Sequence, residues 1–97
     1  MIEVLRHEDF APHVDKMFRF VGWHGALRLA RIETPRRMDG PVQARPPFTL
    51  IFAGAPGDIL PEGLYTASVD GQPNIEFYIM PIHTPAADRQ EYQAVFN

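Results

Sequence analysis

Hydrophobic residues alternate with other residues in six short runs along this chain, which is the period-two pattern of β-strands that bury one face. The clearest run lies at residues 47–53, where Phe48, Leu50 and Phe52 share one face and the opposite face is half apolar. We therefore predict a strand in the middle of a sheet. Gly and Pro residues stop this strand and a second alternating run follows at residues 63–69, so the pair is interpreted as a β-hairpin with a long loop.

The complete pattern predicts strands at residues 16–21, 26–34, 47–53, 63–69, 74–82 and 90–96. Within the second run Leu27 and Leu29 are in phase but Ile32 is not, so we expect a β-bulge near Ala30 and Arg31.

Two further local signals concern a turn and a helix. Asp70 and Gly71 separate two of the strands and predict a type I′ turn. A helix of one or two turns is predicted near residues 7–14, because Glu8 and Asp9 favour a helix N-terminus and the proline that follows limits its length.

The fold class predicted from these elements is all-β, with about six antiparallel strands, because short connections join consecutive strands. The strands form either a small barrel or a two-layer sandwich, and the sequence does not choose between the two. The length of 97 residues and a hydrophobic content of 45% suit a modest core, so residues 1–97 are predicted to form a single β domain. We expect the short N-terminal helix to cap one end of it.

The composition excludes several classes of function. The chain has no cysteine, which rules out disulfides, thiolate metal sites and cysteine nucleophiles. A net charge of −3, with nine Lys and Arg residues among twelve acids, disfavours nucleic-acid binding. The N-terminus lacks a signal-peptide pattern, and no apolar run reaches the roughly 18 to 20 residues of a membrane helix. We expect a cytoplasmic protein that does not bind membranes.

The pattern of reactive residues does not predict catalysis. Ser68 is the single serine and has no nucleophile elbow around it. His7 and His13 lack the i, i+4 spacing that places two metal ligands on one helical face, so they and the nearby Glu8 and Asp9 are interpreted as a polar helix start. We therefore predict no catalytic, cofactor-binding or metal-binding residues.

Two segments are candidates for interaction. Trp23 and His24 lie in a turn flanked by glycines, where the tryptophan either plugs one end of the core or is an exposed anchor for a partner. We favour the plug.

The second segment is the proline-rich stretch at residues 35–46, which is predicted to be a long surface loop. Its Arg36, Arg37 and Arg45 suit an anion such as a carboxylate or phosphate. An exposed, solvated loop is the favoured interpretation.

The chain also resembles a family of small bacterial proteins, of about 100 residues, known only as a domain of unknown function. The resemblance rests on five motifs: LxxxDF at residues 5–10, PFTLIFAG at 47–54, LPxGxY at 60–65, IMPI at 79–82 and YxAVFN at 92–97. Members usually have Val-Gly where this chain has Val14 and Asp15, and often Gln where it has Glu62. The resemblance implies no catalytic residues, and it implies a small accessory or assembly module near phage-tail-like structures.

Together these observations predict a non-enzymatic module that binds a protein partner or itself, through an exposed strand edge or the loop at residues 35–46. The alternative is a small-molecule binder or enzyme that uses the interior of a barrel, with Tyr65 and Tyr78 near its mouth. A filled core favours the first interpretation, whereas an open apolar cavity favours the second.

Overall fold

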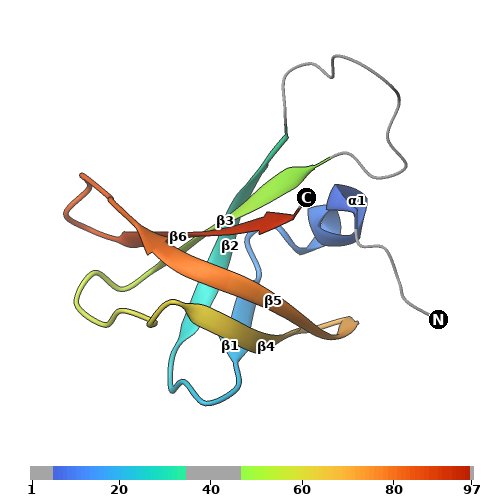
Figure 1. Ribbon diagram of the computed structural model, residues 1–97, viewed down its shortest axis with the longest axis horizontal. Helices are drawn as coiled ribbons and strands as arrows, with labels where there is room; N and C mark the ends of the chain where they lie inside the picture. Colours follow the sequence, from blue (N-terminus) through green and yellow to red (C-terminus); the bar gives the residue numbers. More distant parts are fainter. Residues whose placement is uncertain (1–5, 35–46, 97) are drawn as a thin grey trace.

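A computed structural model describes residues 6–34 and 47–96 of the protein. Six strands form a closed antiparallel β-barrel, and two short helical turns precede them (Figure 1). The elements are α1 (His7–Phe10), the 3-10 turn η1 (Ala11–His13), β1 (Met17–Phe20), β2 (Ala26–Glu33), β3 (Phe48–Gly54), β4 (Gly63–Val69), β5 (Gln72–Ile82) and β6 (Gln90–Phe96). The all-β prediction is confirmed, and the barrel is the correct one of its two forms.

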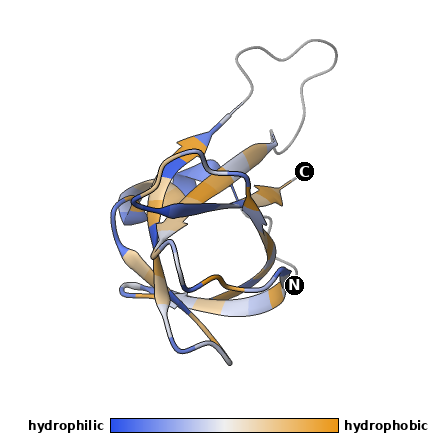
Figure 2. Ribbon diagram, turned by 90° about the vertical axis from the view of Figure 1, so that its left-hand side faces the viewer, coloured by the Kyte–Doolittle hydropathy of each residue, from blue (hydrophilic) through white to orange (hydrophobic). Residues whose placement is uncertain are grey.

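The order of the strands around the barrel is β1, β2, β3, β6, β5 and β4, and β4 returns to pair with β1. Figure 2 shows the strands curving around a common interior. The predicted hairpin between β3 and β4 is therefore wrong. β3 pairs with β2 and β6, whereas β4 pairs with β1 and β5. Gly and Pro residues after β3 show where the chain bends, but residues 55–62 carry it across one end of the barrel instead of back along β3.

The predicted bulge in β2 is present at the expected place. The pairing of β2 with β3 shifts register between Leu29 and Arg31, and Ala30 is the extra residue. The shift restores the inward orientation of Ile32, which packs against the core. A local strand pattern thus predicted an irregularity of the backbone.

The interior of the barrel is filled by one cluster of buried side chains that includes all seven phenylalanines. Their rings form a continuous series of contacts, for example at 4.7 Å between the centroids of Phe48 and Phe96 and 5.9 Å between those of Phe52 and Phe77. The cluster consists of Phe10, Phe18, Phe20, Leu27, Leu29, Phe48, Leu50, Phe52, Leu60, Ala67, Val69, Ile75, Phe77, Ile79, Tyr92, Ala94 and Phe96.

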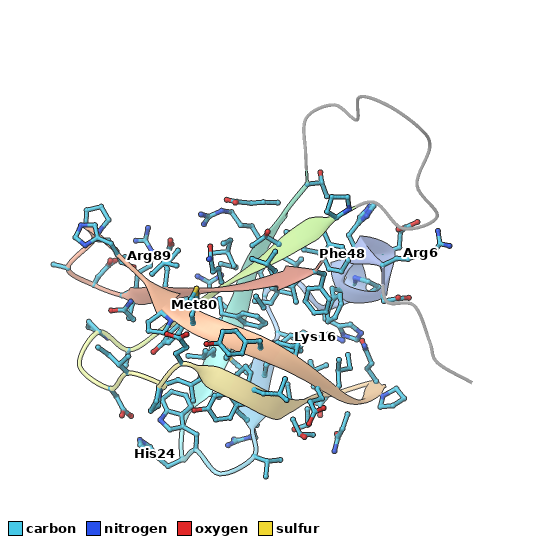
Figure 3. All side chains as sticks on the ribbon, in the orientation of Figure 1. Arg6, Lys16, His24, Phe48, Met80 and Arg89 are labelled. Atoms are coloured by element: carbon cyan, nitrogen blue, oxygen red, sulfur yellow. The ribbon has the colours of Figure 1, made fainter. Side chains whose placement is uncertain are left out.

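Each end of the barrel is closed by a residue from outside the strands. At one end α1 places Phe10 against Phe48 and Phe96, with ring centroids 5.8 and 5.4 Å apart, and Figure 3 shows Phe48 beside this helix. At the other end Leu60 is fully buried, and its backbone N–H donates to the hydroxyl of buried Tyr92 over 2.9 Å. The segment that crosses this end is thus attached by both a side chain and a hydrogen bond.

The outer surface of β3 is covered by long side chains from the strands on either side. Ile51 points away from the barrel interior yet is only 3% exposed, because Arg31 of β2 and Gln93 of β6 are its cross-strand neighbours. The Arg31 guanidinium reaches across β3 to within 3.6 Å of the Glu91 carboxylate. A hydrogen bond from Arg89, and then the charge of Arg31, lower the pKa of Glu91 despite its partial desolvation. Glu91 therefore stays ionised at neutral pH.

Three of the described residues between the elements have positive φ, and Gly22 in the turn between β1 and β2 is one of them, with a φ of 90°. Gly71 has a φ of 86° between β4 and β5, but Asp70 does not have a positive φ, so the predicted type I′ turn is wrong. The register of β4 against β5 also shifts between Ala67 and Val69, which changes the twist before this turn.

Asp15 is the one non-glycine residue with positive φ among the described residues, with a φ of 74° in the bend that leads into β1. Its backbone N–H donates to the Leu29 carbonyl over 2.7 Å and its carboxylate accepts from Arg28 over 3.0 Å. This is the position at which the resemblance implies glycine. The backbone conformation gives a physical reason for that preference, since glycine has no Cβ to oppose a positive φ.

We predict that Asp15→Gly raises the free energy of unfolding by about 0.5 kcal/mol, as relief at positive φ outweighs the added entropy of the unfolded chain. Asp15→Ala is the matched control, because it also removes the exposed ion pair with Arg28 but keeps a Cβ. The glycine variant should exceed the alanine variant by about 1 kcal/mol in urea unfolding. Equal stability of the two variants would show that the φ of Asp15 carries no cost.

Tyr92→Phe should lower the free energy of unfolding by about 1–2 kcal/mol at pH 7, because the buried Leu60 N–H loses its acceptor. Tyr65→Phe is the control, since the Tyr65 hydroxyl donates to the Pro61 carbonyl at the surface. This variant should lose less free energy of unfolding than Tyr92→Phe. A Tyr92→Phe variant as stable as the wild type would contradict the proposed attachment of the crossing segment.

The same variant has a pH signature. Burial raises the pKa of Tyr92 above that of a free tyrosine, although the hydrogen bond from Leu60 reduces the shift. The folded state therefore holds the phenolic proton more tightly than the unfolded state. The protonated Tyr92 hydroxyl thus contributes to the free energy of unfolding. This contribution is fully present below the unfolded pKa of about 10 and is lost as the pH rises through the folded pKa. The alkaline loss of stability should be shallower in Tyr92→Phe.

Candidate interaction surface

The outer surface around β4 carries large hydrophobic side chains in contact with solvent, and Met17 on the neighbouring β1 is also 54% exposed. Val21, Leu64 and Tyr78 are 67%, 63% and 48% exposed. The outer faces of antiparallel strands in small domains are usually polar, and a group of exposed apolar side chains marks an interaction site more often than single ones do. We call this surface the β4 face; it consists of Arg19, Val21, Leu64, Thr66, Glu76 and Tyr78.

The strand register brings these residues together. Leu64 lies directly opposite Tyr78, and Thr66 lies opposite Glu76, in the pairing of β4 with β5. On the other side of β4, the Val21 N–H donates to the Thr66 carbonyl over 2.9 Å. The three apolar side chains are therefore neighbours on the outer surface: Leu64 lies on β4, Tyr78 on β5, and Val21 directly after β1.

Tyr78 is held in place by its hydroxyl, which donates a hydrogen bond to the Glu62 carboxylate. This hydrogen bond, followed by desolvation and the negative charge of Glu62, raises the pKa of Tyr78. The phenol therefore stays neutral across the physiological range, and the ring presents an apolar surface with its polar tip occupied.

An open pocket of about 280 Å³ lies beside the β4 face, where β1 meets β4. Met17, Arg19 and Ser68 form one part of it, with Val69 and Asp70 at the start of the next turn. The pocket is a recess of the outer surface, and its lining includes one basic residue, Arg19, and one acidic residue, Asp70. Such a recess suits a side chain or backbone segment of a partner protein.

The pairing of β1 with β4, which closes the barrel, is short. Its register includes only the pairs Arg19 with Ser68 and Phe20 with Ala67. The β4 face therefore covers the closure with the fewest paired residues in the described barrel.

The predicted pair Trp23 and His24 lies away from the helix, in the turn between β1 and β2, and Figure 3 shows His24 at this turn. His24 Nε2 is 2.5 Å from Asp58 Oδ2, which links this turn to the segment crossing the barrel end. Both side chains are exposed, so the pair contributes little to stability. Trp23 is half-buried and packs against the core. The indole lies so close to Gly25 that a Cβ there would be 2.9 Å from its ring.

The three predicted arginines Arg36, Arg37 and Arg45 lie outside the described residues, as does the rest of the predicted loop at 35–46. The structure therefore does not relate them to Trp23 or His24.

The other polar and ionisable side chains do not come together in a metal site or a shared pocket within the described residues. In the part of the chain that the structure describes, no three His, Asp or Glu side chains lie together as metal ligands. Tyr65 and Tyr92 are turned toward the core, whereas Tyr78 is on the outer surface, so these tyrosines do not line one pocket. Neither described helical segment is long and apolar enough to cross a membrane.

The β4 face was missed by reasoning from the sequence, although a signal was present. Leu64 shares its phase with Thr66 and Ser68, the polar side of its strand. An apolar residue on the polar side of an alternating strand was the sign of an exposed hydrophobic position. Its neighbours Val21 and Tyr78 become part of the same surface only through the pairing of β4 with β1 and β5.

These features define a small closed β-barrel with a packed interior and an apolar outer face. The family model of a domain of unknown function, DUF6916, matches residues 5–96, so the chain belongs to that family. Searches of curated proteins and of solved structures gave no match to this chain.

The environment of Trp23 can be tested with the close contact at Gly25. Gly25→Ala should displace the indole, because the new Cβ would overlap the ring. Trp23 is the only tryptophan, so its fluorescence reports this change directly. We expect a red-shifted emission maximum and a loss of about 1–2 kcal/mol in the free energy of unfolding. Gly57→Ala is the control, since a Cβ at Gly57 would meet no atom within 4 Å. An unshifted spectrum for Gly25→Ala would mean that the indole does not pack as described.

Proposed function

We propose that this protein is a non-enzymatic module that binds a protein partner, and that it binds through the β4 face. The observation that supports the proposal is the group of exposed apolar side chains formed by Val21, Leu64 and Tyr78. Their burial against a partner would remove apolar surface from water, which is the main favourable contribution to protein association. The adjoining pocket adds a recess with polar groups at its rim.

A face suits this role better than a strand edge. Every described strand pairs with a neighbour on both sides over at least part of its length, so the closed barrel leaves no whole strand free at an edge within these residues. Association of this barrel with another protein would therefore proceed by packing of side chains.

The alternative function, a small-molecule binder or enzyme that uses the barrel interior, has less support. The cluster of core side chains occupies the interior, and Phe10 and Leu60 close its two ends. A ligand would have to displace aromatic rings that contact one another. The accessory role near phage-tail-like structures remains part of the proposal, because assembly proteins act by binding other proteins.

Leu64→Glu should abolish this binding, because it places a charge at the centre of the apolar surface. Val95→Glu is the matched control: Val95 is 52% exposed, but it lies on β6, which does not pair with β4. Association is measured by light scattering over a wide concentration range and by capture of native partners on immobilised protein.

We expect Leu64→Glu to lose the complex that the wild type and Val95→Glu both form, while all three unfold at similar temperatures. A wild type that binds neither itself nor another protein would refute the proposed function. A complex that survives Leu64→Glu unchanged would place the binding surface elsewhere.

A further inference from the structure

We infer that the partner of the β4 face is a second copy of this chain, bound around a two-fold axis that pairs Arg19 of each copy with Glu76 of the other. This inference rests on the proposed function, because it names the partner of the same surface.

Arg19 and Glu76 lie on opposite sides of β4 and point outward. Arg19 on β1 pairs with Ser68, and Glu76 on β5 pairs with Thr66. Both are exposed, and each is flanked along its strand by buried residues. The point midway between the two charges therefore lies over β4 near Ala67.

A two-fold axis through this point, lying along the surface, can exchange the positions of Arg19 and Glu76. Because a two-fold interface is self-complementary, the axis forms the pair of opposite charges twice. The same rotation carries Val21 of one copy toward Leu64 of the second copy, since both residues lie on the same side of the midpoint along β4. Apolar positions thus meet apolar positions, and opposite charges meet at the rim.

The charges are available for this pairing. Within residues 6–34 and 47–96, neither Arg19 nor Glu76 forms an ion pair. Arg28, Arg31 and Arg89, in contrast, make five contacts with carboxylates in these residues. Rim charges contribute modestly to affinity, but they select the orientation and suppress arrangements that bring like charges together. An orientation with Arg19 against Arg19 of the second copy would be repulsive.

Exchanging the charges tests the arrangement. Arg19→Glu alone places two acids opposite each other, and Glu76→Arg alone places two arginines opposite each other. Each variant should self-associate at least about tenfold more weakly than the wild type, because like charges meet at both pairs. An equimolar mixture should recover a heterodimer, since the acids of one variant then face the arginines of the other.

The double variant Arg19→Glu/Glu76→Arg is the matched control, because it keeps the net charge of the wild type and should self-associate. Adding Leu64→Glu to both members of the mixture should abolish the heterodimer, which excludes attraction between the reversed charges without contact of the apolar side chains. Association is followed by analytical ultracentrifugation, and folding by thermal unfolding of every variant.

The outcomes separate this inference from the proposed function. A wild type that stays monomeric, yet captures another protein in a manner lost in Leu64→Glu, would overturn the second copy as partner and leave the proposed function intact. A dimer that persists in Leu64→Glu would overturn both. A dimer lost in Leu64→Glu but unaffected by either charge reversal, or not recovered in the mixture, would overturn the two-fold arrangement.

Discussion

The packing of aromatic rings inside the barrel is the interaction on which the rest of the structure depends. Six short strands enclose a small interior, and it is filled because the phenylalanines of four strands and α1 meet there. Two residues from outside the strands, Phe10 and Leu60, complete the packing at the two ends. Their burial determines where α1 lies and why residues 55–62 cross the barrel end. The interior thus positions the loops as well as the strands.

Much of the fold was predictable because alternation and turn signals are local. The six strands, the short helix and the bulge at Ala30 all follow from residues that are close in the sequence. Strand pairing is not local, and the predicted hairpin between β3 and β4 was wrong for this reason. Gly54 and Pro56 specify a bend, but the destination of the chain depends on the barrel end that buries Leu60 and on the acceptor provided by Tyr92, 32 residues later.

The candidate site was less predictable than the fold. Trp23 and His24 were predicted to be candidates for interaction because of their side-chain chemistry. In the structure His24 pairs with exposed Asp58, and the partly buried indole packs against the core. The residues of the β4 face have ordinary chemistry when considered singly. Their importance arises from register, since Leu64 gains Tyr78 as a neighbour only through β5 and Val21 only through β1. Such a surface is defined by pairing that the sequence pattern does not specify.

The position of the β4 face connects binding with the stability of the barrel. The face lies across the pairing of β1 with β4, where the register has only two residue pairs between strands that otherwise depend on core packing. A partner bound there would contact side chains from both strands, so it would bind the closed barrel better than any state in which these strands separate. A ligand that prefers the native state stabilises it in proportion to the logarithm of its concentration relative to Kd. An apolar surface on a well-packed domain would otherwise favour aggregation. Placed at the shortest pairing of the barrel, it makes association and closure mutually reinforcing.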